Sequence, residues 1–381
     1  VPFPAESATA SPISVSSVSS VSSVVEFVPT SPPSAALSER IAVARRRREG
    51  PVPAEGAPKA AKTATPYDRY PSYLALHATG ELARRADAAW ELLRGCTVCP
   101  QNCPRDRTRG LTGACHSGTE TIVGSWNLHW REEPPITGTR GAGTIFFGGC
   151  QARCTYCQNF WLSQQGGGIR VGPERLADMM LSLQRKGAHN IDLVTPTHFV
   201  PQILRALVIA AEAGLRIPLV YNCAGYEHLH VLKLLDGVVD IYLPDAKYAS
   251  NAEALRTSKM HHYVEYNRAT LLEMYRQVGG LVVDEDGIGV RGLVVRHLVM
   301  PNHHAGTREV LGWIAQNLGS DIGLSVMDQY FPAYKAHNDP DLSRRLSWTE
   351  YREALDIVEE LPFENLFLQE DLTMIDTTDA V

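Results

Sequence analysis

The sequence predicts an α/β fold, a partial (β/α)6 TIM-like barrel with an N-terminal cysteine-rich extension. Two observations support this prediction. Apolar strand patterns alternate with helix patterns six times between residues 141 and 365. These strand patterns are hydrophobic along most of their length, as parallel strands covered by helices are. Right-handed crossovers curl such repeats toward a barrel, and the chemistry of a barrel lies at the C-terminal ends of its strands.

The elements are predicted from their periodicity and their end signals. An amphipathic helix is expected from about residue 78 to Gly95. Strands are expected over residues 144–147, 190–194, 217–221, 238–243, 293–300 and 322–327. Helices are expected over residues 173–186 and 307–316 and from about residue 347 onward. Three further helical stretches are expected to end near residues 214, 235 and 275. Pro173 suits a first helical turn, Gly187 suits a C-terminal cap, and Ser347 with Glu350 forms a capping-box pattern.

Composition divides the chain into four segments. Residues 1–65 are rich in Ser, Val, Pro and Ala and repeat a Ser-Ser-Val unit, which is typical of a disordered low-complexity tail. We expect residues 66–140 to form the helical, cysteine-rich extension. Residues 141–365 are expected to form the barrel, and residues 366–381 are expected to form a C-terminal tail. A mitochondrial presequence is arginine-rich and acid-poor, whereas this tail has Glu6 and Glu26 and no arginine before Arg40. We therefore prefer a disordered tail to a mitochondrial targeting segment.

Charge and cysteine usage narrow the function. The 381 residues include 36 basic and 42 acidic ones, a net charge of −6, which does not favour a nucleic-acid binder or a basic membrane-surface protein. No apolar run is long enough to span a bilayer. Seven of the eight cysteines fall in two tight groups, which in a large chain indicates metal ligation in a reducing compartment. We therefore expect a cytoplasmic protein with no nucleic-acid or membrane partner.

One cysteine group follows the first predicted strand. Cys150, Cys154 and Cys157 have the spacing C-x3-C-x2-C, with Tyr156 before the last cysteine. Iron–sulfur clusters normally take four cysteines, so three on a cubane leave one iron with an open site. The alternative is a structural zinc loop, but zinc sites more often use C-x2-C pairs. The spacing therefore favours a 4Fe–4S cluster.

This pattern resembles that of the radical S-adenosylmethionine superfamily, whose signature is C-x3-C-x-aromatic-C. The resemblance implies that the cluster's fourth iron chelates the amino and carboxylate groups of S-adenosyl-L-methionine. It also implies a low-potential electron donor and an enzyme that forms a 5′-deoxyadenosyl radical, which abstracts hydrogen from a substrate. Further stretches resemble the pyruvate formate-lyase activating enzyme-related branch, and they span about residues 90–365. They include 132–135, 143–147, 157–159, 193–198, 296–298 and 327–330. The substrate is then either a glycyl site on a partner protein or a small molecule.

Polar residues at the other strand ends are candidate contacts for S-adenosyl-L-methionine. Thr195 and Thr197 stand where the superfamily often has a Gly-Gly-Glu motif, from which this sequence departs. Asp245 or Lys247 could reach the ribose or the carboxylate, and His198 could contact a ligand or carry a proton. Each of these residues could instead cap a helix or satisfy a loop.

The second cysteine group lies upstream of the first, in the extension. Cys96, Cys99, Cys103 and Cys115 have the spacing C-x2-C-x3-C-x11-C, which suits either a structural zinc ion or an auxiliary iron–sulfur cluster. The rival to an enzyme is a non-enzymatic zinc-binding interaction protein with two cysteine sites. A methyltransferase is disfavoured because no G-x-G-x-x-G loop lies between a strand and a helix.

Overall fold

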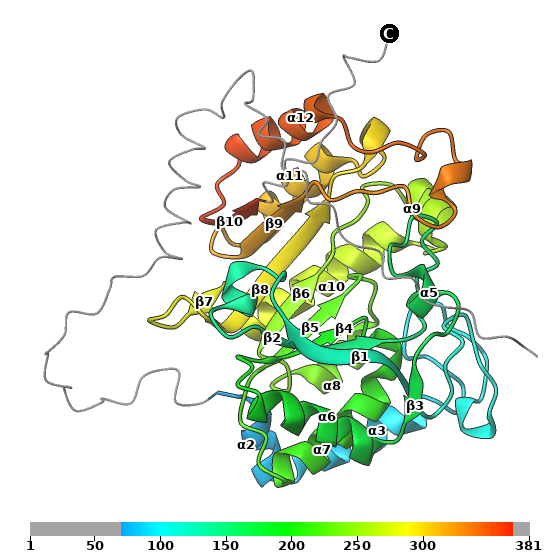
Figure 1. The fold of residues 1–381 in the computed structure, drawn as a ribbon, viewed down its shortest axis with the longest axis vertical. Coiled ribbons are helices and arrows are strands. Elements are labelled where there is room, and N and C mark those ends of the chain that lie inside the picture. The colour runs from blue at the N-terminus through cyan, green and yellow to red at the C-terminus, as the bar shows by residue number, and fades with distance from the viewer. Residues whose placement is uncertain (1–69, 369–381) are drawn as a thin grey trace, which may run out of the picture. The chain divides into compact units, whose positions relative to one another are not determined.

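The computed structural model describes residues 70–368, which form a mixed α/β fold around a large, mostly parallel sheet (Figure 1). The predicted tail at residues 1–65 lies outside the described residues, as does 369–381 of the predicted C-terminal tail. Within the described part, no helix combines the length and the apolar character needed to cross a membrane.

The strands of the sheet are ordered β10-β9-β8-β6-β5-β4-β2-β1-β3, and β7 pairs with β8. The parallel strands are β2 (Ala142–Phe147), β4 (Ile191–Val194), β5 (Leu219–Cys223), β6 (Ile241–Pro244), β8 (Gly289–Leu298), β9 (Gly323–Met327) and β10 (Asn365–Leu368). Their spatial order follows their order in the chain without a reversal, unlike a doubly wound sheet. Crossovers of one hand then place the connecting helices on one face of the sheet.

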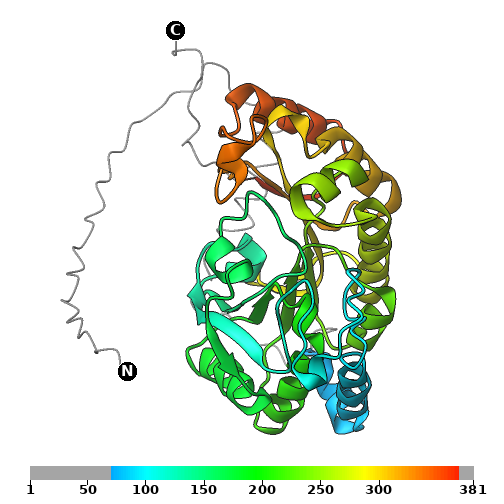
Figure 2. The same ribbon diagram turned by 90° about the vertical axis from the view of Figure 1, so that its right-hand side faces the viewer.

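The helices pack against one another as this connectivity requires (Figures 1 and 2). They are α2 (Tyr73–Ala78), α3 (Glu81–Glu91), α4 (Pro134–Thr137), α5 (Phe160–Ser163), α6 (Pro173–Arg185), α7 (Val200–Glu212), α8 (Leu229–Leu235), α9 (Asn251–Ser258), α10 (Tyr263–Val278), α11 (Thr307–Asn317) and α12 (Trp348–Glu359). Helix α7 contacts α6 on one side and α3 on the other, and α3 also contacts α8. The extension therefore contributes a helix to the same layer as the crossover helices.

The two faces of the sheet differ in chemistry. Ile191 and Leu193 of β4 belong to the main hydrophobic core, which the helices cover. Alternation along a strand places Asp192 on the opposite, inner face. A smaller apolar cluster lies apart from the main core, and it includes Val220 of β5 and Ile136 of α4. The inner face therefore carries an apolar layer together with polar residues, and these polar residues form the candidate site.

The six predicted strands are all present, although their ends differ by a few residues. The sequence did not predict β10, nor the antiparallel strands β1 (Thr121–His129), β3 (Ile169–Val171) and β7 (Val282–Val283). Strand β1 lies before the boundary drawn at residue 140 and still pairs with β2, so part of the extension joins the sheet.

One predicted helix is shorter in the structure, and another is divided. The helix expected from residue 78 to Gly95 begins at Glu81 and ends at Glu91, and a separate helix, α2, precedes it; Gly80 between them is left-handed. The helical stretch expected through residue 275 is split into α9 and α10, because Lys259 and His262 adopt left-handed φ angles of 56° and 52°. The expected capping box between Ser347 and Glu350 is confirmed.

Candidate active site

The first cysteine group follows β2 directly, at the C-terminal end of the strand. The turn into this loop requires glycine, because Gly149 has a φ angle of 74° and a Cβ there would lie 2.4 Å from the carbonyl oxygen of Cys115. Gly148 N donates to the carbonyl oxygen of Ile122 on β1. The two glycines thus seat the loop against both β1 and the upstream cysteine group.

Segments that are distant in sequence hold the cysteine loop in place. Arg153 N donates to Ser258 O and Thr155 N donates to Thr257 O, each at 2.8 Å, at the C-terminal end of α9. Lys335 N donates to Thr155 O at 2.8 Å from the other direction. Because the backbone of the loop is paired with two other segments, the three cysteines are fixed relative to the sheet.

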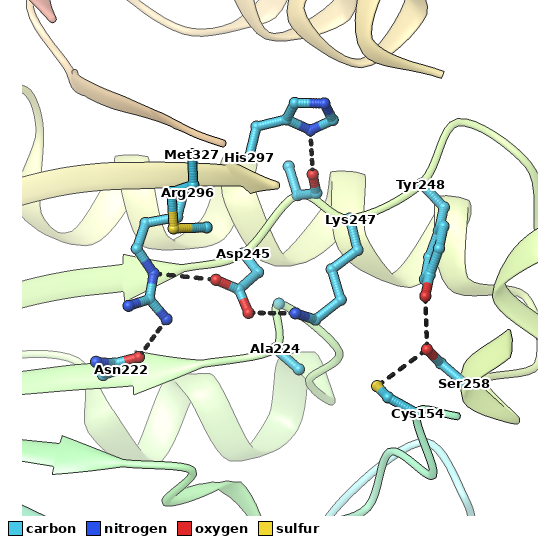
Figure 3. Close-up of polar contacts among 12 residues, drawn as sticks. Cys154, Asn222, Ala224, Asp245, Lys247, Tyr248, Ser258, Arg296, His297 and Met327 are labelled. Atoms are coloured by element: carbon cyan, nitrogen blue, oxygen red, sulfur yellow. Dashed lines mark hydrogen bonds and ion pairs between the residues drawn. The ribbon is translucent and has the colours of Figure 1, made fainter. Parts of the chain in front are cut away.

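Hydroxyl groups lie against two of the three sulfurs. Ser258 Oγ donates to Cys154 Sγ at 3.0 Å, and Tyr248 OH lies 2.7 Å from Ser258 Oγ (Figure 3). Ser163 Oγ lies 3.1 Å from Cys157 Sγ. Hydrogen bonds to thiolates stabilise their negative charge, so these contacts suit ligating sulfurs.

Burial raises the pKa of the Cys150 thiol, and the neighbouring Cys154 and Cys157 raise it further. Cys154 is buried and Cys150 and Cys157 are partly buried, so three thiolates in this loop would need positive charge beside them, as bound iron would provide. Within residues 70–368, no three His, Cys, Asp or Glu side chains are arranged to hold a single metal ion. A cubane does not need that arrangement, because each cysteine binds a different iron.

The structure also gathers the upstream cysteines. Burial raises the pKa of Cys99, and Cys115, Cys96 and Cys103 all lie close enough to raise it further. Cys103 Sγ accepts from Ala114 N at 3.3 Å, which draws the fourth cysteine's segment onto the first three. The group lies beside the cysteine loop, since Gln101 Nε2 donates to Gln151 O at 2.9 Å.

Asp245 and Lys247 meet at the end of β6, as the strand-end argument predicts. Lys247 Nζ donates to Asp245 Oδ2 at 2.6 Å, and Arg296 Nε of β8 donates to Asp245 Oδ1 at 3.0 Å. Arg296 also donates to Asn222 Oδ1 at 2.6 Å (Figure 3). Burial alone would raise the pKa of Asp245, but Lys247 and Arg296 outweigh burial and hold this pKa below its usual value. Asp245 is therefore a carboxylate at neutral pH.

The threonines after β4 occupy different environments. Thr195 is half-buried with a φ angle of 61°, and its N–H donates to Asn222 O at 2.8 Å. Thr197 is fully buried, accepts from Gln151 Nε2 at 2.9 Å and donates to Glu227 Oε1 at 2.7 Å. The Thr197 hydroxyl therefore links the cysteine loop to a buried carboxyl group.

His198 contacts the backbone at the start of the cysteine loop. Its side chain is buried, and Nε2 donates to the carbonyl oxygen of Gly148 at 2.9 Å. Burial lowers its pKa to about 3, so the ring is neutral at physiological pH. Arg107 of the extension donates to the carbonyl oxygen of His198 at 2.8 Å. These contacts favour a role in holding the Gly148–Gly149 turn over a role as proton carrier.

Several residues of the site were not identified as site residues from the sequence. Glu132, from the loop before α4, lies 3.6 Å from an Arg296 nitrogen. Glu227 is buried and hydrogen-bonded to both Thr197 and Tyr221. Ser258 reaches Cys154 from 104 positions further along the chain. Only Glu132 carried a local signal, the run Glu-Glu-Pro-Pro, because the contacts of Glu227 and Ser258 depend on tertiary structure.

The sequence has a relative among archaeal proteins. It is 30% identical over 295 residues to the uncharacterized protein MJ0674 of Methanocaldococcus jannaschii, and the alignment covers 74% of this chain and 80% of that protein. The chain belongs to the MJ0674 family. No family model matches the chain. The name of the MJ0674 relative states no activity.

Proposed function

We propose that the protein is a radical S-adenosylmethionine enzyme of the pyruvate formate-lyase activating enzyme-related branch. In this proposal Cys150, Cys154 and Cys157 hold a 4Fe–4S cluster at the mouth of a partial (β/α)6 barrel. When bound, the cluster supplies the electron that cleaves S-adenosyl-L-methionine to methionine and a 5′-deoxyadenosyl radical, which abstracts hydrogen from a substrate. A low-potential electron donor supplies that electron, and we infer a cytoplasmic location from the reduced cysteines.

One observation carries the proposal. A C-x3-C-x2-C loop follows the first parallel strand, with hydroxyl groups against Cys154 and Cys157. Cys150, Cys154 and Cys157 would hold the cluster, and the strand ends present Asp245, Lys247 and Arg296, one anion and two cations. S-adenosyl-L-methionine carries a carboxylate, an ammonium, a sulfonium and ribose hydroxyls. The charges of this strand-end cluster match these groups.

The residues around the strand ends then have separate tasks. Asp245 and Lys247 orient the carboxylate or the ribose of S-adenosyl-L-methionine. Thr195, at the end of β4, donates through its N–H to the carbonyl oxygen of Asn222 on the neighbouring strand β5 and is the further candidate contact. Thr197 and His198 hold the cysteine loop from within. The upstream group of Cys96, Cys99, Cys103 and Cys115 holds zinc or an auxiliary cluster and braces the same loop. In this assignment the cofactor would bind beside the bonded group of Asp245, Lys247 and Arg296.

The proposal is tested by anaerobic reconstitution with iron and sulfide. Iron, sulfide, zinc and, after addition of dithionite and S-adenosyl-L-methionine, 5′-deoxyadenosine are measured on one sample. We expect the wild type to form 5′-deoxyadenosine and Cys150→Ala to lose both that activity and the iron of one cluster. Cys223→Ala is the matched control, because Cys223 is a buried cysteine outside both groups, and it should behave as the wild type.

Two results would contradict the proposal. One is 5′-deoxyadenosine formation by Cys150→Ala at the wild-type rate. The other is a wild-type protein that contains zinc and no iron and cleaves no S-adenosyl-L-methionine, combined with unfolding of Cys150→Ala by circular dichroism. That second result would favour a zinc-stabilised interaction protein instead.

A further inference from the structure

Cys154 lies at the end of a chain of buried hydroxyl groups. Ser258, the last residue of α9, places its Oγ 3.0 Å from Cys154 Sγ, and Tyr248 OH lies 2.7 Å from Ser258 Oγ (Figure 3). Two further hydroxyl groups contact Tyr248 OH, namely Thr257 Oγ1 at 2.8 Å and the OH of Tyr156. Tyr156 belongs to the cysteine loop itself, so the chain starts in that loop and returns through α9 to one of its sulfurs.

The contacts of these hydroxyl groups fix the direction of donation once Cys154 is a thiolate. A hydroxyl group has one hydrogen to donate, and a thiolate has none. Ser258 therefore donates to Cys154 Sγ and accepts from Tyr248. Because the hydrogen of Tyr248 goes to Ser258, the Tyr248 oxygen accepts from Thr257 and Tyr156. The hydrogen bonds of the chain thus all point toward the sulfur.

The hydroxyl groups of the chain are shielded from solvent. The exposed fractions of Tyr156, Tyr248, Thr257 and Ser258 are 6%, 2%, 1% and 0%. Thr257 shares its hydrogen with the carbonyl oxygen of Glu253 at 2.6 Å, so Tyr156 is the second donor to Tyr248. Hydrogen bonds in a buried chain polarise one another and act through a low local dielectric. Donation to the sulfur is therefore stronger than from an isolated, exposed serine.

A hydrogen bond to a cluster ligand acts unequally on the two oxidation states of the cluster. When one electron passes from the low-potential donor to the cluster, the donor is oxidised and the negative charge on the cluster and its sulfurs increases. Ser258 donates to one of these sulfurs, and hydrogen bonds to charged acceptors are the stronger ones. Hydrogen bonds to the sulfurs are among the features that set the reduction potential of an iron–sulfur cluster. The chain therefore favours the reduced state.

We propose that Ser258 raises the reduction potential of the cluster held by Cys154, and that Tyr248 is a positioning residue that acts through Ser258. The cluster itself rests on the proposed function, and the role of the hydroxyl chain is additional to it. In a purely structural role, the same hydroxyl groups would only satisfy one another inside the protein. That role predicts lower stability when one of them is removed and no change in the potential, so the potential distinguishes the two roles.

The test is a redox titration of the anaerobically reconstituted full chain, without S-adenosyl-L-methionine, followed by the electron paramagnetic resonance signal of the reduced cluster. We expect Ser258→Ala to lower the reduction potential. At a fixed potential, the ratio of reduced to oxidised cluster should fall about tenfold, which corresponds to a shift of about 59 mV for a one-electron couple. Tyr248→Phe keeps the serine donor and removes the group that polarises it, so the shift should have the same sign and be smaller.

A buried tyrosine elsewhere in the fold provides the matched control. Tyr73 of α2 is fully buried, and its OH donates to the carbonyl oxygen of Ile217 at 3.1 Å. Tyr73→Phe therefore removes one buried, hydrogen-bonded phenol hydroxyl, as Tyr248→Phe does, without touching the chain that leads to Cys154. It should keep the wild-type potential.

An unchanged or higher potential in Ser258→Ala would overturn the proposal. If Ser258→Ala holds no cluster, Tyr248→Phe decides, and loss of the cluster from both variants would show that the hydroxyl groups retain the cluster and do not set its potential. A wild type with zinc and no iron would overturn this proposal and the proposed function together. Shifted potentials in the variants, with no 5′-deoxyadenosine formed by the wild type, would contradict the enzyme proposal alone.

Discussion

Asp245 and Asp192 are both buried carboxyl groups on the inner side of one sheet, at β6 and β4, with only β5 between those strands. Asp245 is bonded to Lys247 and Arg296, and these two cations lower its pKa. Asp192 has one long contact with a hydroxyl and an oxygen without a partner, and burial raises its pKa. The fold therefore pairs the carboxylate of Asp245, at the C-terminal ends of the strands, with two cations. It leaves the carboxyl group of Asp192, within β4, without a bonded cation.

Removal of the shared cation should have the largest effect on this comparison. Arg296→Met would leave Asp245 with one partner and Glu132 without its nearest cation. Loss of one partner of a buried ion pair costs about 3–5 kcal/mol, because the remaining charge is left unpaired. We expect the free energy of unfolding, measured by urea titration at pH 7, to fall by that amount.

The surface provides a control for the arginine substitution. Arg94 is paired with Glu91 at an exposed position, so Arg94→Met should leave the urea midpoint unchanged. Equal midpoints for Arg296→Met and the wild type would mean that the interior network contributes nothing to stability. The pairing of Asp245 would then make no difference to the free energy of unfolding.

Glu227 is an intermediate case, because it has hydroxyl donors but no cation. Thr197 and Tyr221 donate to its carboxyl group, yet burial raises its pKa from 4.5 to about 7. An acid whose pKa is higher in the folded protein loses stability as pH rises from its unfolded pKa to its folded one. Because one pKa unit corresponds to about 1.4 kcal/mol, wild-type stability should fall by about 3 kcal/mol between pH 4.5 and 7 through this residue.

Glu227→Gln should remove that decline. The measurement is the difference in unfolding free energy between wild type and variant at several pH values from 4.5 to 8. We expect the difference to change in favour of the variant as pH rises and to level off above pH 7. Two curves that stay parallel across this range would show that the hydroxyl donors compensate the charge of Glu227 as fully as the cations compensate Asp245.

The sequence identified Asp245 and its partner Lys247 as site residues, and it did not identify Asp192. Six apolar strands and their end positions identified Asp245 and Lys247, because parallel strands bring their C-terminal ends together. Asp192 lies in the middle of the apolar run Ile-Asp-Leu-Val, where the pattern alone gives no role to a single acid. Glu132 reaches the interior only because β1 pairs with β2, and β1 was missed since its alternation is interrupted by Gly124. Short, non-local pairings of this kind leave little trace in local periodicity.

The cysteine loop also has contacts that the sequence does not predict. The spacing of Cys150, Cys154 and Cys157 is local, so the sequence places these residues in one loop. The hydroxyl group that contacts Cys154 belongs to Ser258, and the sequence gives no reason to select it among the serines. Likewise, the sequence suggests that His198 contacts a ligand or carries a proton, and the structure directs its Nε2 to the backbone of the loop. The shared loop of the three cysteines was thus predictable, whereas the residues that contact it from other segments depend on tertiary structure.

Replacement of the unpaired acid should have the smallest effect on stability. Asp192→Asn preserves the shape of the side chain and replaces a carboxyl group that has one long hydroxyl contact, so at pH 6 we expect a change of about 1 kcal/mol or less. The pKa of Asp192 is raised by burial, so wild-type stability should decline as pH rises. The variant should therefore be the more stable protein at pH 9, by urea titration against the wild type. A variant less stable than the wild type at pH 9 would show that Asp192 already has a compensating partner in the folded protein.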